Sequence, residues 1–341
     1  MDLLPSDEQL EIVGVVDDFL TTRFPTSRLR ERRAEPSSID PAVWAECGDL
    51  GWFSLGLSED LGGVGYGLAE EALVFREIGR CLAPGPFVAT ALGARVAAIA
   101  GRSDLAEAII SGVAPIALAE PRDNDVSLGE RVSGKFDVFD APGSAYVLAV
   151  DADGASLIDI TDIVATSVPS IDPGVRLDRA QLDDVVAVGH VSASNDPIFL
   201  RGSVLVAAML TGIAAATRDM ASQYAKDRQQ FGRPIGVNQA IKHACADMAT
   251  RAEAAASQLL FAALSVDEQR GDADFQATSA RIVAAQAAVE NAAGNVQVHG
   301  GIGYTFEHDA HLYVKRAQMF AHMLGDSRRQ MAALLGMPGA Q

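Results

Sequence analysis

Apolar residues recur every three or four positions over the first hundred residues, the spacing that gathers them on one face of a helix. The stretch 10–20 shows this spacing clearly. Glycines between residues 62 and 67 interrupt it, and a new helix is expected to begin near Leu68. An Ala-rich helix is expected at about 88–100. Residues 6–115 are therefore predicted to form a helical zone.

The pattern changes between residues 116 and 190. Short β-branched runs such as AYVLAV, SLIDI and DDVVAVGHV alternate with turn-forming Asp, Gly and Pro residues. This alternation is typical of short strands joined by turns. It predicts a small all-β domain, and the polar stretch SASNDP is expected to link this domain to the C-terminal part of the chain.

Helical spacing returns after the linker. Four long helices are expected, at about 200–228, 237–269, 275–299 and 310–335. Helices beyond the usual length of about 11–12 residues favour a bundle. The predicted fold is mainly α with a small β domain. Its parts are an N-terminal helical domain (1–115), a middle β-barrel or sandwich (116–195) and a C-terminal four-helix bundle (196–341).

The composition narrows the function. A chain of 341 residues with 49% hydrophobic residues can build a substantial core. Its formal net charge of −18 repels phosphate backbones and anionic lipids, so nucleic-acid and membrane-surface roles are not expected. The N-terminus has no secretory pattern and no membrane span is expected. Three cysteines without CxxC spacing indicate reduced thiols in a cytoplasm.

The first segment with candidate chemistry is RQQFGRPIGVNQ, residues 228–239. Arg228 should end one helix and Gln239 should begin the next, with a turn at Phe231 between them. A guanidinium, an aromatic ring and an amide at one corner suit a planar ligand that bears phosphates. The alternative is an ordinary helix–helix corner in which Arg228 is a surface charge.

The second segment is QVHGGIGYT, residues 297–305. Gly300 and Gly301 allow a close approach of the backbone to a ligand, and the amide of Gln297 precedes them. Glycines also end many helices, so this segment alone is weak evidence. The nearby histidines lack a carboxylate or thiol set at ligand spacing, so no metal site is expected.

Taken together, the two segments resemble the acyl-CoA dehydrogenase family. RQQFGRPIGVNQ is similar to the family's R-x-x-F-G-x-x-I-x-x-x-Q corner, and QVHGGIGYT to its Q-x-x-G-G-x-G-Y segment. SEDLGGVGYGL resembles the family's P-E-x-x-G-G-x-G segment. The resemblance covers essentially the whole chain, and the family has the same helix–β–helix order.

The resemblance implies FAD as cofactor and an acyl-CoA thioester as substrate. In this family a base removes the α-proton and the β-hydrogen leaves as hydride to the flavin. An electron-transfer protein is the expected acceptor. In this family certain residues bind the FAD of a neighbouring subunit. The residues here that match them are Arg228, Phe231, Gln239, Gln297, Gly300 and Gly301.

Neither family position for the catalytic Glu carries one here, so the catalytic residue is unknown. The first position falls on Gly325, followed by Asp326, a weak candidate base that is otherwise expected to cap a helix. The second falls on Gly202–Ser203, next to Arg201. The pair Glu70–Glu71 is expected on a solvated face.

The flavin side of the β domain also departs from the family. The family's T-E-P-x-A-G-S-D loop reads LAEPRDNDV here, so Arg122, Asp123 and Asn124 replace small residues. The W-I-T/S strand segment has no counterpart, since the tryptophans are Trp44 and Trp52. The chain is therefore expected to keep the part that serves a neighbour's FAD and to lack its own flavin pocket and base.

This one-sided loss resembles the small subunits of heteromeric acyl-CoA dehydrogenases in steroid-degrading actinobacteria. It favours an α2β2 heterotetramer in lipid metabolism, in which a homologous catalytic subunit supplies the Glu. One alternative is a self-sufficient homo-oligomer with an unusual base such as Asp326. Another is a non-catalytic scaffold subunit that orders the partner's FAD.

Overall fold

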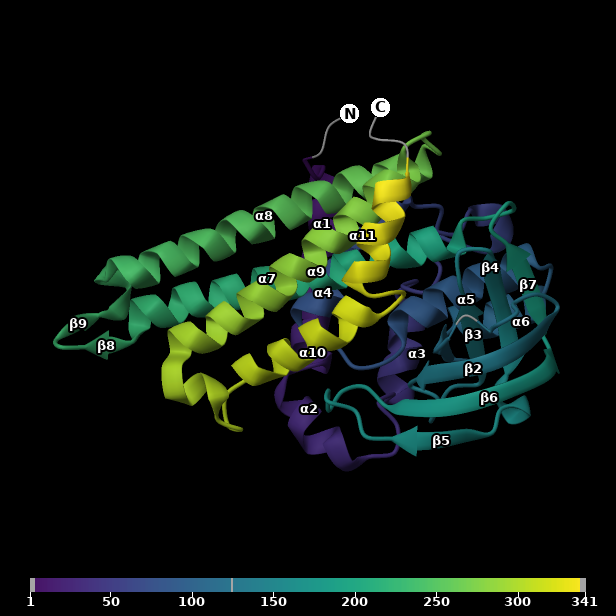
Figure 1. Ribbon diagram of the computed structural model, residues 1–341, viewed down its shortest axis with the longest axis horizontal. Coiled ribbons are helices and arrows are strands. Elements are labelled where there is room, and N and C mark those ends of the chain that lie inside the picture. The colour runs from purple at the N-terminus through teal and green to yellow at the C-terminus, as the bar shows by residue number, and fades with distance from the viewer. Residues whose placement is uncertain (1–3, 124, 338–341) are drawn as a thin grey trace. The chain divides into compact units, whose positions relative to one another are not determined.

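The computed structural model describes residues 4–123 and 125–337 and is mostly helical. Its contacts divide the chain into two compact units (Figure 1). One comprises residues up to 26, residues 72–83 and the chain from 204 onward, and the other comprises residues 27–71 and 84–203. The domain boundary predicted at 115/116 and the predicted SASNDP linker both lie between secondary-structure elements, because a helix ends at Ile110, strands occupy 116–192 and a helix begins at Ile198.

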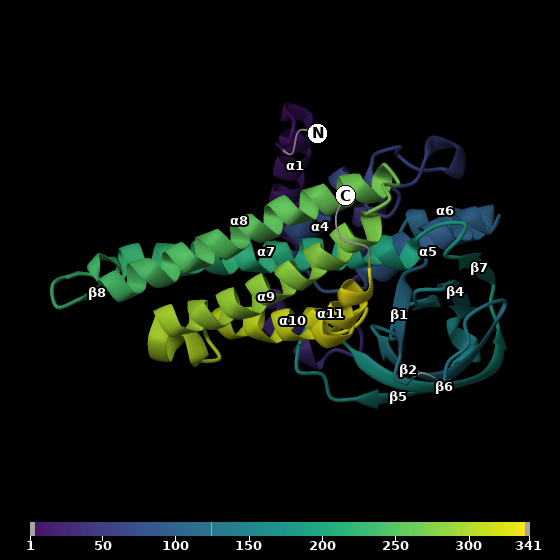
Figure 2. The same ribbon diagram turned by 45° about the horizontal axis from the view of Figure 1, so that its top comes forward.

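The first unit is a helical bundle in which α7, α8 and α9 run side by side (Figures 1 and 2). The predicted helices 200–228, 237–269 and 275–299 are confirmed within a few residues. Alanines line the buried faces of α8 and α9, so the backbones pack closely. The helices of this unit are α1 (Asp7–Arg23), the second half of α4 (Leu68–Arg80), α7 (Ile198–Asp227), α8 (Gln239–Asp267), α9 (Ala273–His299), α10 (Ala310–His322) and α11 (Ser327–Gly336).

Two glycines set the crossing of α4 and α7. A Cβ on Gly79 would lie 2.1 Å from the carbonyl oxygen of Met209, and one on Gly212 would lie 1.9 Å from that of Arg76. Only glycine permits such backbone contact. By length and composition α7 could cross a membrane, but 83% of its most apolar window is buried inside the protein, so its apolar side chains serve the protein's own core.

The predicted single helix 310–335 is wrong, because the chain breaks after His322. Leu324 and Gly325 both have positive φ, 55° and 97°, which no α-helix accommodates. A new helix begins at Ser327 with Asp326 as its N-cap. Periodicity does not reveal the break, since apolar residues continue across it.

The second unit contains a seven-stranded curved sheet (Figure 2). The strand order is β5-β6-β2-β1-β3-β4-β7, and all pairs are antiparallel except β1 with β3. Its helices include α2 (Ser27–Glu31), α3 (Pro41–Asp49), α5 (Phe87–Ile99) and α6 (Ser103–Ile110). The strands are β1 (Ile116–Pro121), β2 (Arg131–Phe139), β3 (Tyr146–Val150), β4 (Gly154–Asp159), β5 (Ala165–Val168), β6 (Leu177–Val186) and β7 (Gly189–Ser192).

Strand β2 is not among the predicted runs, although it is central in the sheet. It pairs with β1 on one side and β6 on the other. Val132, Gly134, Phe136 and Val138 are buried, while Ser133, Lys135 and Asp137 between them are more exposed. This period-two alternation is the signal in the sequence that identifies the strand. Glycine and lysine within it make the apolar run look shorter than it is.

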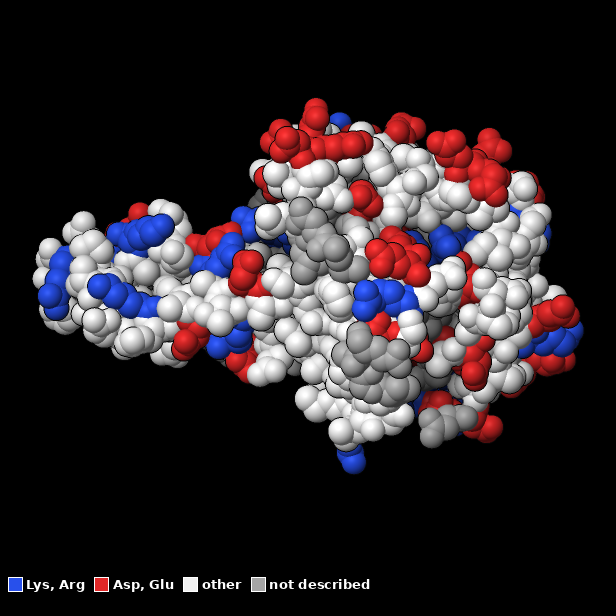
Figure 3. Space-filling view, turned by 90° about the horizontal axis from the view of Figure 1, so that it is seen from above, with Lys and Arg blue, Asp and Glu red and all other residues white. Residues whose placement is uncertain are grey.

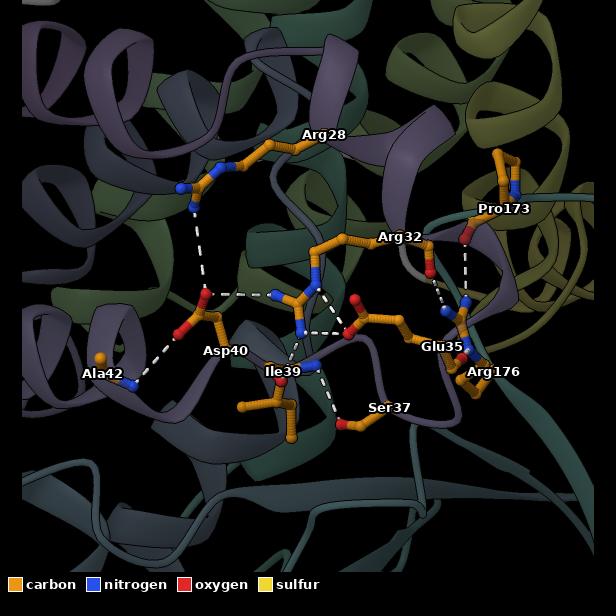
Figure 4. Close-up of polar contacts among 9 residues, drawn as sticks. All are labelled: Arg28, Arg32, Glu35, Ser37, Ile39, Asp40, Ala42, Pro173 and Arg176. Carbon is orange, nitrogen blue, oxygen red and sulfur yellow. Dashed lines mark hydrogen bonds and ion pairs between the residues drawn. The ribbon is translucent and has the colours of Figure 1, made fainter.

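A polar clasp joins helix α2 and the short helix after it to the loop that precedes β6 (Figure 4). The Arg176 guanidinium donates to the backbone carbonyls of Arg32, Glu35 and Pro173 at 2.8–3.0 Å. The Arg32 guanidinium donates to the Glu35 carboxylate and lies 3.4 Å from that of Asp40, which caps α3. These arginines therefore satisfy the chain's own carbonyls and carboxylates.

Candidate cofactor and catalytic site

The segment 228–239 forms a hairpin between α7 and α8. Strands β8 (Gln229–Gln230) and β9 (Arg233–Pro234) pair, and Phe231 and Gly232 make the turn with φ of 52° and 77°. Two positive φ values are the geometry of a type I′ hairpin, which is uncommon for a non-glycine residue. The turn places the Phe231 ring at its tip, 99% exposed.

Arg228 and Gln239 flank the hairpin, as predicted. The Arg228 amide donates to the carbonyl of Tyr224 at 2.8 Å and so continues the last turn of α7. The Arg228 carbonyl accepts from the amide of Ile235 at 2.8 Å, which ties the two arms together. Gln239 is the first residue of α8, and both side chains are exposed.

The segment 297–304 forms a glycine corner at the end of α9, which continues as a 3₁₀ turn, Gly300–Tyr304. Gly300 has φ 63° and ψ −143°, a conformation essentially confined to glycine. No atom lies within 4 Å of a Cβ built on Gly300 or Gly301, so one side of the corner is open. Gln297 is exposed one turn earlier.

The structure brings the hairpin and the glycine corner together through an apolar cluster. Val298 of α9 and Met248 of α8 are buried in it, and Tyr224 of α7 and Ile235 of the hairpin pack against it. The His299 ring stacks on the Tyr224 ring with centroids 4.1 Å apart. All six predicted cofactor residues therefore belong to one end of the bundle. Sequence reasoning missed Tyr224, although it precedes Arg228 by one helical turn.

This end of the bundle carries exposed cations on a chain of strongly negative charge. Blue side chains gather at the left of Figure 3, at the end of the bundle that holds the hairpin. Lys226, Arg228, Arg233 and Lys242 are the cationic residues there that are exposed or nearly so. Such a patch attracts an anionic ligand even though the whole protein is acidic.

These residues fit the outer part of an FAD site. Guanidinium groups bind phosphate oxygens, an exposed ring can pack on a planar group, and the open glycine corner lets a ligand approach the backbone. The exposed side chains stand on the surface of this chain rather than in a cavity of it. The geometry therefore suits a cofactor shared with another subunit.

The turn that corresponds to the family's first base position is committed to a different role. The Asp326 carboxylate accepts from the backbone amide of Arg329 at 2.8 Å, so the predicted N-cap is confirmed. Gly325 has φ 97°, where a Glu side chain would be strained. The buried guanidinium of Arg281 donates to the carbonyls of Phe320 and Met323 and fixes the end of α10.

The second base position contains a buried ion pair. The Arg201 guanidinium in the first turn of α7 lies 3.1 Å from the carboxylate of Glu71, and both side chains are less than 9% exposed. The expectation that Glu71 is solvated is therefore wrong. A Cβ on Gly56 would lie 2.5 Å from the Glu71 carboxylate and 2.7 Å from the guanidinium, so this backbone presses against the pair.

The β1–β2 connection, the family's flavin loop, is charged and paired here. Arg122 lies 3.3 Å from Asp137 of β2, and Asp123 lies 3.9 Å from Lys135. Asn124 lies outside the described residues. Trp44 packs on Phe53 and Phe87, with ring centroids 4.9 and 4.5 Å apart, in the helical part of this unit.

Within residues 4–123 and 125–337 no three His, Cys, Asp or Glu side chains gather in a way that could hold a metal ion. The three cysteines are free. Burial raises the pKa of the Cys81 thiol to about 11 and that of Cys47 well beyond its ordinary range. These thiols are therefore poor nucleophiles at neutral pH.

Family models support the resemblance drawn from the motifs. Residues 6–115 match the N-terminal domain of acyl-CoA dehydrogenases, and residues 198–335 match their C-terminal domain. Acyl-CoA dehydrogenase IpdE2 of Mycobacterium tuberculosis is 32% identical over 97% of this chain and 98% of its own length. Acyl-CoA dehydrogenase FadE34 of the same organism is 33% identical over 87% of this chain, which spans 42% of that protein.

Solved structures show the same fold. The Tcur3481–Tcur3483 steroid ACAD G363A variant superimposes with a TM-score of 0.85 at 25% identity, covering 97% of each chain. The ChsE4–ChsE5 complex from Mycobacterium tuberculosis gives 0.88 at 24% identity over the full length of both chains. The motifs, the matched domains and these likenesses establish that the chain belongs to the FAD-dependent acyl-CoA dehydrogenase family.

Proposed function

We propose that this chain is a subunit of a heteromeric acyl-CoA dehydrogenase that binds the outer part of the FAD. A homologous partner chain supplies the catalytic Glu. The complex dehydrogenates an acyl-CoA between its α and β carbons. FAD accepts the β-hydrogen as hydride when bound. Arg228, Phe231 and Gln239, together with the glycine corner, hold the outer part of the FAD that sits mainly in the partner.

One observation carries the proposal. The cofactor residues at the end of the bundle are exposed and turned outward, whereas Gly325 and Arg201 mark base positions without a usable carboxylate. The Glu71 carboxylate is buried in its ion pair with Arg201, so it is not free to act as a base. A chain built this way needs its base from elsewhere.

The substrate and the setting are inferred from the relatives. One structural neighbour is described as a steroid ACAD and another is a complex of two different chains. We extend this to an α2β2 assembly acting on a bulky, polycyclic acyl-CoA in the cytoplasm. An electron-transfer flavoprotein would then reoxidise the cofactor.

The test is co-expression of this chain with homologous acyl-CoA dehydrogenase chains from the same genome, followed by purification and flavin quantification. One FAD for every two chains, together with loss of activity when the partner's Glu is changed to Gln, supports the proposal. A preparation of this chain alone that is yellow, carries one FAD per chain and turns over would overturn it.

The two alternatives give distinct results in the same experiment. A self-sufficient homo-oligomer carries one FAD per chain and loses activity in the Asp326→Asn variant. A scaffold subunit gives half a flavin per chain, and its Arg228 variants change FAD retention while the bound enzyme keeps its turnover rate. The comparison of these variants within one complex separates a scaffold from a subunit that shapes the active site.

A further inference from the structure

Three neighbouring rings that the reaction does not use lie beside the glycine corner, and we call them the stack, although His308 is tilted by 50° to His299. Tyr224 stacks on His299 with ring centroids 4.1 Å apart and planes inclined by 28°. His299 in turn faces His308, with centroids 4.4 Å apart. These rings come from the last turns of α7, the end of α9 and the chain just before α10. The stack therefore ties three elements together beside the hairpin.

The hydrogen bond at His308 requires a lone pair on that ring, and His299 is held in a buried position. The His308 Nδ1 accepts from the backbone amide of Ala310 at 3.1 Å, which needs a lone pair on that nitrogen. His299 is buried, and its Nδ1 lies 2.8 Å from the carbonyl oxygen of Asn295, to which it donates. A second proton on both rings would bring two like charges together, with ring centroids 4.4 Å apart, in a partly buried site.

The corner depends directly on His299. A Cβ on Gly303 would lie 2.8 Å from the Cβ of His299 and 3.0 Å from the carbonyl oxygen of Val296, so the turn packs onto this side chain. The carbonyl of Tyr224 also accepts from the amide of Arg228. Moving the stack would therefore disturb both the corner and the start of the hairpin.

We propose that the Tyr224–His299–His308 stack is a pH-sensitive lock that positions the glycine corner against the end of α7. The lock is closed while the buried His299 ring is neutral, and protonation of this ring on acidification opens it. The link to cofactor binding rests on the function proposed above, whereas the opening itself is a property of this chain. His299 and His308 are thus positioning residues of the cofactor end.

The burial of His299 and the neighbouring His308 also favour opening at low pH. Burial lowers the pKa of His299 below its ordinary value of 6.5, and the neighbouring His308 acts in the same direction. A group whose pKa is lowered in the folded state loses its stabilising effect as the pH falls below 6.5. The titratable or charged residues near the stack include Lys226, Asp227 and Arg228 at the end of α7, Arg233 in the hairpin, Lys242, His243, Cys245 and Asp247 on α8, Tyr304 in the corner, Glu307 after it, and Asp309 and His311 at the start of α10.

The expected size follows from linkage. If His299 stays neutral in the closed form and titrates at 6.5 in the open form, the opening equilibrium rises about tenfold between pH 7.5 and pH 5.5. Residues outside the corner show no such change.

Hydrogen exchange of the full chain, corrected for intrinsic rates, measures this opening in peptides covering residues 300–305. We expect the wild type to open up to about tenfold more at pH 5.5 than at pH 7.5. The His308→Gln variant should lose part of this dependence, and the His299→Phe/His308→Gln variant should lose nearly all of it. His322→Gln, which changes an exposed histidine on α10, is the matched control and should behave as wild type.

A wild-type corner that opens equally at both pH values would overturn the lock, and so would a full pH dependence in the double variant. The same variants are then compared in the complex for FAD retention at pH 7.5 and 5.5. Flavin lost in parallel with corner opening supports the lock as a positioning device. Corner opening with unchanged flavin retention supports the lock and contradicts the assignment of Gly300 and Gly301 to the cofactor.

Discussion

The end of the bundle and the start of α7 use arginine in opposite ways. Arg228 is exposed beside an exposed aromatic ring and an open glycine corner. Arg201 is buried, paired with Glu71 and covered by the backbone of Gly56. An exposed guanidinium contributes little to stability and remains available to a ligand. A buried ion pair is part of the core, because removing either partner leaves the other charge buried without its counterion.

Under the proposed function, this contrast explains how a chain can keep half of an active site. To bind a cofactor, the end of the bundle needs only exposed side chains that reach another molecule. The position at the start of α7, where the family can carry its base, can instead become part of the core. Four sets of substitutions test whether the two regions differ in this way, from the largest expected effect to the smallest.

Arg201→Met should lower the free energy of unfolding by about 3–5 kcal/mol, because it leaves the Glu71 carboxylate buried without its cation. The measurement is urea unfolding followed by circular dichroism. Arg228→Met should change the same quantity by less than about 0.5 kcal/mol. Equal effects of the two substitutions would remove the contrast between the regions. The double variant Glu71→Leu/Arg201→Met should lose less than the single one, since both charges are gone.

Arg228→Met should weaken FAD binding by the complex about ten- to a hundredfold, because a charge-assisted hydrogen bond is worth about 1.5–3 kcal/mol. Equilibrium dialysis with flavin fluorescence gives the dissociation constant. Lys226→Met removes the same charge from an exposed neighbour and should change binding less than about threefold. If the two variants behave alike, the patch attracts FAD only through its overall charge.

Gly56→Ala should destabilise the chain by about 1–3 kcal/mol, because its Cβ would overlap the carboxylate of Glu71 and the guanidinium of Arg201. Gly301→Ala is the matched control, since no atom lies within 4 Å of its Cβ. It should change stability by at most about 0.5 kcal/mol. Thermal unfolding of both variants at one pH makes the comparison. A Gly56→Ala protein as stable as wild type would mean that the backbone does not press on the pair.

Asp326→Ala should cost about 1 kcal/mol of stability through loss of the N-cap, whereas Asp326→Asn retains a capping side chain and should be nearly neutral. In the complex, Asp326→Asn should keep activity within about twofold, because a capping carboxylate is not the base. Steady-state rates of the two variants test this. A stable Asp326→Asn protein that has lost its activity would instead identify Asp326 as the base and favour the self-sufficient enzyme.

Local signals in the sequence were enough to predict part of the molecule. The ends of α7, α8 and α9 follow from Gly and Pro positions and from apolar periodicity, and they lie within a few residues of the expected ranges. The six residues proposed to bind the cofactor could be named because two short motifs carry them. The cap at Asp326 is also predictable, since a carboxylate before SRRQM offers its oxygen to a free amide.

The tertiary structure decided what depends on distant partners. Glu71 is buried because Arg201, 130 positions later in the chain, neutralises it, and no local pattern reveals such a pair. The break after α10 follows from two left-handed residues and from carbonyls that Arg281 satisfies. The meeting of Tyr224, His299 and His308 likewise depends on how α7 and α9 pack. Local free energies determine where helices begin and end, whereas burial, pairing and the gathering of a site are properties of the packed chain.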